Sequence, residues 1–74
     1  MNKMNKQLID ARGKRTQTDV ATAIGISVKH LSKLERNQRN PSLKTAWKLA
    51  NFYGKSMEEL FSDILEEGEE DELQ

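Results

Sequence analysis

The 74-residue sequence contains no cysteine, one histidine, one proline and one tryptophan. Without cysteine the chain can form neither a disulfide nor a thiolate metal site, and a single histidine argues against a zinc site. The longest stretch free of charge, residues 20–28, is far shorter than the ~20 apolar residues needed to cross a membrane. Residues 1–7 lack the apolar segment of a secretory signal. We therefore expect a cytoplasmic protein without a metal, a cofactor or a membrane partner.

Chain length and glycine usage argue against an enzyme. A chain this short buries only about 60% of its extended surface, which leaves little room for a pocket of about 300 Å³. The four glycines are spread singly at positions 13, 25, 54 and 68, so no glycine-rich phosphate loop is present. No small-molecule ligand is evident from the sequence.

The formal net charge is zero, but the two signs are separated along the chain. Residues 1–55 hold all 12 basic residues and three acidic ones, which gives a net charge of +9. Residues 56–74 hold nine acidic residues and no basic one, a net charge of −9. A body this basic indicates a polyanionic partner, and an acidic end is typical of a solvated tail.

Turn and capping residues divide the first half of the chain into short helices. The first is expected over Asn5 to Arg12, before Gly13. The second follows the N-cap Thr16 and ends at Gly25. The third starts after the N-cap Ser27 and reaches Arg36 or Asn37. The link between the second and third helices is too short for antiparallel packing, so they must cross steeply, as in a helix-turn-helix unit.

A second break, at Asn40-Pro41, precedes a fourth helix from about Leu43 to Tyr53, capped by Ser42. Five positions of this helix form one apolar stripe: Leu43, Ala46, Trp47, Ala50 and Tyr53. We expect Trp47 and Tyr53 in the core and not as platforms for base stacking, because both lie on this stripe. Ser56 and Glu59 predict a capping box that opens a short fifth helix. Residues 1–65 would then be one domain. Residues 66–74 repel one another and are predicted to be a disordered acidic tail.

Several segments resemble the phage-repressor and Cro-type helix-turn-helix family of transcription regulators, and the resemblance spans about residues 5–61. The segments that carry it are residues 16–21, 24–27, 31–36, 39–43, 49–50 and 54–61. The resemblance implies an all-α, compact five-helix lambda-repressor-like DNA-binding domain that works as a symmetric dimer, with the third helix in the major groove. It also implies that Gln17 holds a phosphate and that Glu35 pairs with an arginine, for which Arg12 is the nearest candidate. Asn37 stands where the family has glycine, and asparagine tolerates the left-handed conformation.

The third helix carries an exposed stripe whose charges are unfavourable for a helix that faces only solvent. Lys29 lies in the first turn, where the helix dipole disfavours a cation, and Lys29 and Lys33 form a like-charge i,i+4 pair. Both features make sense if a polyanion supplies the missing negative charge. Lysine can donate to guanine, serine to several base edges, and valine can contact a thymine methyl group. The predicted base-reading residues are Val28, Lys29, Ser32 and Lys33.

Other polar residues of the same region are suited to phosphates, which fix position without reading sequence. The predicted phosphate contacts are Thr16, Gln17, Ser27, His30, Arg36, Gln38 and Arg39. Two of these have plainer alternatives, because His30 can be an ordinary surface residue and Gln17 an ordinary helix-start residue.

The end of the domain holds more large apolar residues than a small core needs. They are Phe52, Met57, Phe61, Ile64 and Leu65. They either complete the core or form a symmetric dimer patch, for which we select Met57, Phe61, Ile64 and Leu65. Double-stranded DNA and a second copy of the chain are thus the expected partners.

The sequence therefore predicts a sequence-specific DNA-binding transcription regulator, a repressor that binds a palindromic operator as a dimer. The alternative is a protein-interaction module of the same fold, such as an antitoxin or a mobile-element adaptor. The acidic tail either keeps the domain soluble or acts as an intramolecular DNA mimic on the basic face.

Overall fold

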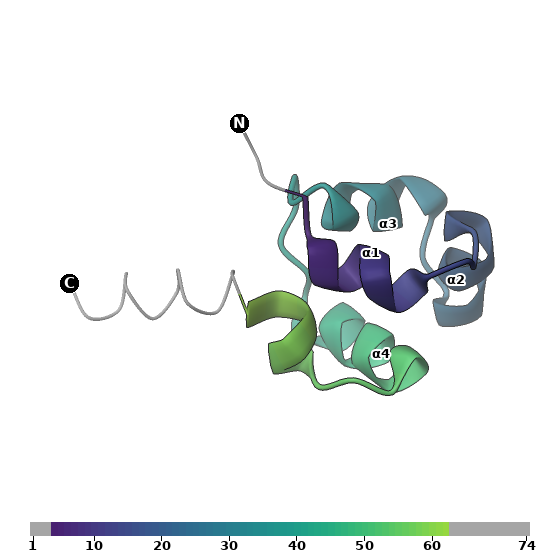
Figure 1. The fold of residues 1–74 in the computed structure, drawn as a ribbon. Helices are drawn as coiled ribbons and strands as arrows, with labels where there is room; N and C mark the ends of the chain where they lie inside the picture. The colour runs from purple at the N-terminus through teal and green to yellow at the C-terminus, as the bar shows by residue number, and fades with distance from the viewer. Residues whose placement is uncertain (1–3, 63–74) are drawn as a thin grey trace.

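The computed structural model describes residues 4–62, and within that range it contains helices and turns but no strand (Figure 1). The helices are α1 (Lys6–Arg12), α2 (Gln17–Ile24), α3 (Val28–Glu35) and α4 (Leu43–Tyr53), followed by a fifth helical segment at residues 57–62. The all-α, five-helix fold predicted from the sequence is confirmed. The predicted disordered tail, residues 66–74, lies outside the described residues, as does the end of the proposed 1–65 domain.

The capping residues define where the helices begin. In three N-caps the side-chain oxygen accepts a hydrogen bond from the backbone amide three residues further on, at 3.0 to 3.1 Å: Thr16, Ser27 and Ser42. Ser56 and Glu59 form both halves of a capping box, since Glu59 N donates to Ser56 Oγ at 3.0 Å and Ser56 N donates to Glu59 Oε1 at 3.4 Å. These contacts satisfy amide groups that have no partner inside the helix.

The turn between α2 and α3 depends on a left-handed residue. Gly25 has φ 79° and ψ 34°, and the next amide, Ile26 N, donates to Ala21 O at 2.9 Å. A side chain at Gly25 would be strained in this conformation, so glycine lets the chain turn within three residues. Asn37 is also left-handed, with φ 56°, just after α3. The expectation that Asn37 tolerates the left-handed conformation is confirmed.

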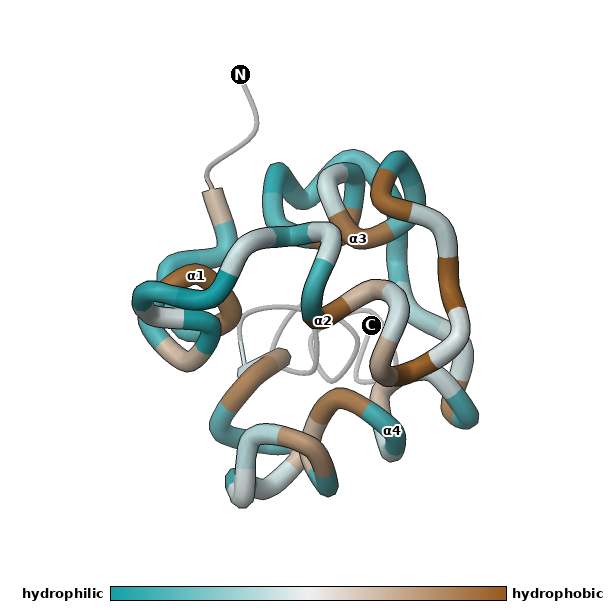
Figure 2. Tube along the Cα trace, turned by 90° about the vertical axis from the view of Figure 1, so that its right-hand side faces the viewer, coloured by the Kyte–Doolittle hydropathy of each residue, from teal (hydrophilic) through white to brown (hydrophobic). Residues whose placement is uncertain are grey.

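All four labelled helices and the fifth segment contribute to one core. Its largest fully buried apolar side chains are Leu8, Val20, Leu31, Leu34, Leu49 and Leu60. Figure 2 shows how brown hydrophobic stretches alternate with teal hydrophilic ones along the helices, as expected for helices with one buried side. Burial of each such side chain contributes about 1.5–3 kcal/mol. The core holds α3 against α1 and α2, with α4 packed on α2.

Two predicted boundaries shift by one or two residues. Asn5 is the N-cap of α1 rather than its first residue, because its side chain accepts from Leu8 N at 3.1 Å. Asn5 is also buried, and its Nδ2 donates to Leu60 O at 3.0 Å, which ties the start of the domain to its last described segment. At the other boundary, α3 ends at Glu35, with Arg36 as the C-cap.

The predicted burial of Trp47 is wrong, since Trp47 is 58% exposed. Leu43, which lies on the same stripe, is 77% exposed. Tyr53 is half-buried. The buried side of α4 is centred on Ala46, Leu49 and Ala50. Two small alanines thus lie on the buried side of this helix, whereas the larger Leu43 and Trp47 are turned outward.

Within residues 4–62, no helix combines the length and the apolar character that crossing a membrane requires.

Candidate nucleic-acid interface

The side of α3 away from the core carries the predicted base-reading residues. Leu31 and Leu34 point into the core, whereas Val28 is 40% exposed and Lys29 is exposed. Ser32 and Lys33 are half-buried on the same helix. Half-burial of Lys33 is compatible with base reading, because a lysine can pack its aliphatic stem on the domain and keep its ammonium group within reach of a ligand.

The solvent side of α3 carries positive charge that no acid of the same helix offsets. Its first turn has no acidic residue, and its one carboxylate, Glu35, is only 2% exposed. Glu35 instead pairs with Arg12 through Nε–Oε2 at 2.8 Å and Nη2–Oε1 at 3.2 Å. The hydrogen bond to Glu35 is the main reason that the pKa of Arg12 is raised. The implied pairing of Arg12 with Glu35 is confirmed, and it leaves Lys29 and Lys33 without a counter-charge on α3.

Gln17 lies where the start of α2 meets the end of α3. Its Nε2 donates to Glu35 Oε1 at 2.9 Å, and its side chain is half-buried. A glutamine amide has two donor protons and a carbonyl oxygen, so one proton remains for another acceptor. The contact to Glu35 holds the side chain in place at the entrance of α2, where a phosphate oxygen can accept that proton.

The hydroxyl groups of the N-caps of α2 and α3 can each donate one further hydrogen bond. Thr16 and Ser27 are exposed, and each side-chain oxygen accepts a backbone amide. A hydroxyl that accepts in this way still carries its own proton, which it can donate to an anion. Both residues stand at helix N-termini, where the dipole also favours an anion.

His30, Arg36, Gln38 and Arg39 follow around the first turn and the end of α3. Burial lowers the pKa of His30, and the positive charge of Arg39 lowers it further. His30 Nε2 is buried and has no hydrogen-bond partner among the described residues, which fits a neutral ring. Arg36 Nε donates to Ser32 O at 3.4 Å, so that side chain lies back along α3. Gln38 and Arg39 are exposed.

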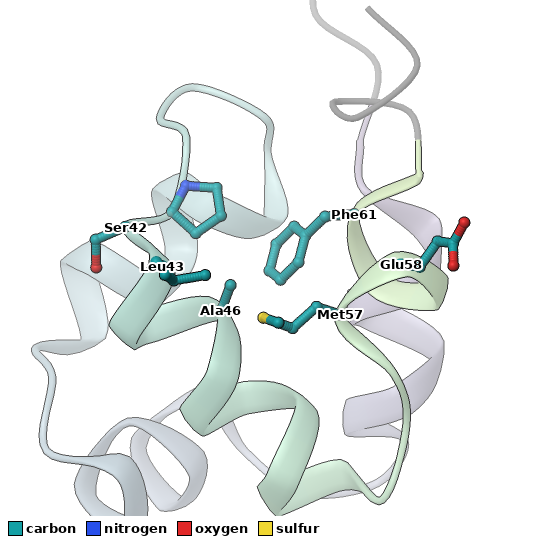
Figure 3. A pocket seen from close by; sticks show the side chains of 7 residues that line it. Ser42, Leu43, Ala46, Met57, Glu58 and Phe61 are labelled. Atoms are coloured by element: carbon teal, nitrogen blue, oxygen red, sulfur yellow. The ribbon is translucent and has the colours of Figure 1, made fainter. Parts of the chain in front are cut away.

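Met57 and Phe61, the two predicted dimer residues that the structure describes, lie away from this surface. Figure 1 shows α1 between α3 and the segment at residues 57–62. A hollow of about 350 Å³ separates that segment from α4, and Figure 3 shows Leu43 and Ala46 facing Met57 and Phe61 across it. Phe61 is 4% exposed and already belongs to the core, and Met57 is half-buried. Ile64 and Leu65 lie outside the described residues.

The sequence reading did not anticipate the role of Arg15 or of Asn5. The Arg15 guanidinium lies 5.2 Å from the Phe52 ring centroid and 5.4 Å from that of Tyr53. It also donates to the carbonyl oxygens at the end of α1, at 3.0 and 3.2 Å. A single arginine before a cap gives no sequence signal for stacking on residues about 40 positions away.

Within residues 4–62 no group of three or more histidine or acidic side chains is arranged to hold a metal ion.

Comparisons with known proteins agree with this arrangement. Residues 6–60 match the family model described as helix-turn-helix. Over 59 residues the chain is 42% identical to the HTH-type transcriptional regulator DdrOP3 of Deinococcus deserti, which covers 80% of this chain and 45% of that protein. Over 46 residues it is 39% identical to the uncharacterized HTH-type transcriptional regulator MJ0272 of Methanocaldococcus jannaschii, and the match covers 62% of this chain and 70% of that protein. The chain belongs to the helix-turn-helix family of transcription regulators.

Proposed function

We propose that this chain is a sequence-specific DNA-binding transcription regulator that inserts α3 into the major groove. The observation that carries the proposal is the solvent side of α3, where Lys29 and Lys33 have no counter-charge on the helix because Glu35 is buried against Arg12. The fold and both named relatives support this function, and it agrees with the expected cytoplasmic location.

The base contacts follow from the chemistry of the exposed side chains. Lys29 and Lys33 donate to guanine O6 and N7, Ser32 bonds a base edge, and Val28 contacts a thymine methyl group. Phosphates on either side are held by the helix-start and loop residues, which are Thr16, Gln17, Ser27, His30, Arg36, Gln38 and Arg39. DNA bound in this way meets α3 between two sets of phosphate contacts, which fixes its register.

A symmetric dimer gives this small surface the affinity that one copy lacks. Two copies with their α3 helices about 34 Å apart would read a palindrome of two half-sites one DNA turn apart. We expect the dimer contact at the hollow between α4 and residues 57–62, with Met57 and Phe61 on one wall. Ile64 and Leu65 follow directly in the chain. Repression is the regulatory effect that needs nothing beyond this surface, because an occupied operator that overlaps a promoter blocks polymerase.

Selection of binding sites from random duplex DNA, at a stated salt concentration, tests the proposal. We expect a palindromic consensus with half-sites one turn apart. The matched control is the variant with both Lys29→Ala and Lys33→Ala, which should select no consensus. A single unrepeated half-site would contradict the dimer. Failure of the native chain to enrich any sequence would contradict DNA reading, and a stoichiometric protein partner in its place would favour the interaction module.

A further inference from the structure

The outer face of α4 combines exposed apolar surface with positive charge. Leu43 and Trp47 are the most exposed large apolar side chains of this helix, at 77% and 58%. Each of them is followed by a lysine: Lys44, which is exposed, comes after Leu43, and Lys48, which is half-buried, comes after Trp47. None of these residues serves the proposed contact of α3 with DNA. This face therefore has a composition suited to a ligand that is both acidic and partly apolar.

Three shallow hollows adjoin along this face. The first, about 350 Å³, lies between Leu43 and the residues Met57 and Phe61 (Figure 3). The second, about 390 Å³, is lined by Met57 and Trp47, and the third, about 480 Å³, by Trp47, Lys48 and Phe52. Met57 lines the first two hollows and Trp47 the last two, so the three are neighbours on the surface around α4, and together we call them the α4 groove.

The lysines of α4 have no acidic partner in the described part of the chain. Between residues 4 and 62 the one ion pair joins Arg12 to Glu35. α4 itself contains no acidic residue, and Lys44 lies in its first turn, where the helix dipole disfavours a cation. Lys44 and Lys48 are also an i,i+4 like-charge pair. As on α3, an anion nearby would remove both penalties.

The chain carries such an anion of its own. Residues 66–74 contain six acidic residues, no basic residue, and an apolar Leu73. The described residues end at Ser62, next to Phe61, which lines the first hollow. Twelve further residues can span about 40 Å when extended, whereas the 11 residues of α4 are about 16 Å long. The acidic residues can therefore reach the whole α4 groove without crossing the domain.

We propose that residues 66–74 of this chain bind in the α4 groove, with their carboxylates on Lys44 and Lys48 and with Trp47 covered. The exit point favours α4 over α3, because α1 separates the segment at residues 57–62 from α3 (Figure 1). Exposed apolar surface also favours α4, since Leu43 and Trp47 can receive Leu73. In this arrangement the negative charge is kept away from the base-reading residues, so the proposal does not depend on the contact of α3 with DNA. The first hollow is also the proposed dimer contact, so a bound tail and a dimer at that hollow exclude each other.

Trp47 is the single tryptophan of the chain, so its fluorescence reports directly on the α4 groove. The experiment measures acrylamide quenching of the full chain, without DNA, against a variant that ends at residue 65. Acrylamide is neutral, so quenching does not respond to the charge of the tail. Because the Debye length falls from about 30 Å at 0.01 M to about 3 Å at 1 M salt, the difference should depend on salt. We expect quenching of the full chain to be about twofold weaker than that of the variant at about 0.01 M salt, and equal at about 1 M.

A second variant keeps the length and removes the charge, with Glu→Gln and Asp→Asn at the six acidic positions between 66 and 72. It should behave like the truncated chain, as should the full chain with Lys44→Gln and Lys48→Gln. The full chain with Lys29→Gln and Lys33→Gln is the matched control and should keep Trp47 protected. Equal quenching of the full and truncated chains at low salt would overturn the proposal. Loss of protection only in the α3 control, or protection that grows with protein concentration, would also overturn it, in favour of the DNA-binding face or of a second copy.

Discussion

Gln17 Nε2 donates to Glu35 Oε1 at 2.9 Å, so the first residue of α2 is tied to the last residue of α3. Arg12 Nη2 donates to the same oxygen at 3.2 Å. One buried carboxylate thus joins α1 to both helices of the helix-turn-helix unit. The arrangement fixes the angle between α2 and α3, and it also fixes the side chain that we expect to hold a phosphate.

The first prediction concerns the stability of this junction. Arg12→Ala leaves the Glu35 carboxylate buried with Gln17 as its remaining side-chain partner. Removal of one member of a buried ion pair costs about 3 kcal/mol, so we expect the free energy of unfolding to fall by that amount. Urea denaturation followed by circular dichroism measures it.

Two further variants separate charge from shape at this site. Arg12→Lys keeps the charge but loses the planar guanidinium that makes two hydrogen bonds to the carboxylate. Its free energy of unfolding should lie between those of the native chain and of Arg12→Ala. The double variant Arg12→Met, Glu35→Met removes both charges and should be more stable than Arg12→Ala alone, because no buried charge is left unpaired. A loss below about 1 kcal/mol for Arg12→Ala would mean that the pair is no stronger than a surface salt bridge.

The second prediction concerns Gln17 as a positioning contact to DNA. Gln17→Ala should weaken binding to operator and to unrelated DNA by the same factor, because a phosphate contact carries no sequence information. One hydrogen bond corresponds to about 0.5–1.5 kcal/mol, or roughly a 2- to 12-fold loss of affinity. Titrations of labelled operator and of labelled unrelated duplexes, at several salt concentrations, measure the two affinities.

Arg39→Gln is the comparison for that experiment. Removal of one cation from a phosphate should lower the slope of log affinity against log salt by about 0.9, whereas the neutral Gln17 should leave the slope unchanged. A loss of affinity for Gln17→Ala that is confined to the operator would instead assign this residue to base reading.

Sequence reasoning located the helices well because their ends have local causes. Thr16, Ser27 and Ser42 cap helices by hydrogen bonds to residues only three positions away, and Gly25 sets the turn through its own backbone conformation. Such signals lie within a few residues of sequence and do not depend on the rest of the fold. The helix-turn-helix unit and the two faces of α3 could therefore be predicted.

Contacts between distant segments could not be predicted in the same way. The stripe of α4 contains more apolar residues than the core can cover, and sequence alone does not say that Ala46 and Ala50 face inward while Trp47 faces solvent. The partner of Glu35 came from the family resemblance and not from spacing. The hydrogen bond from Gln17 to Glu35 depends on how α1, α2 and α3 pack against one another, which no local pattern of the sequence indicates.

The third prediction concerns base reading by α3. Lys33→Ala should weaken binding to the selected operator by about 1–3 kcal/mol and relax the preference at one base pair of each half-site. Binding to unrelated DNA should fall much less, since it depends on phosphate contacts. Competition titrations with operator and non-operator duplexes give the specificity ratio, which is the affinity for the operator divided by the affinity for unrelated DNA.

Lys6→Ala is the matched control for Lys33→Ala, since Lys6 is an exposed lysine of α1 outside the predicted interface. It should leave the specificity ratio unchanged. If neither Lys29→Ala nor Lys33→Ala lowers operator affinity, then α3 does not read the major groove.

The fourth prediction concerns His30, whose pKa is lowered by burial and by the positive charge of Arg39. Because the pKa of His30 is lower in the folded chain than its ordinary value of about 6.5, the unfolded chain binds more protons between the two values. Stability should therefore be unaffected by His30 above about pH 7 and should fall as the pH drops through about 6.5 toward the folded pKa. The His30→Gln variant removes this share of the pH dependence.

Affinity for DNA should change in the opposite direction over the same pH range. A protonated His30 beside a phosphate adds a favourable charge, so acidification from about pH 7.5 to about 5.5 should tighten binding of the native chain more than binding of His30→Gln. Unfolding curves and DNA titrations of both proteins at each pH provide the two measurements. If stability responds to pH through His30 while affinity does not, this histidine is a structural residue of the α3 surface and not a phosphate contact.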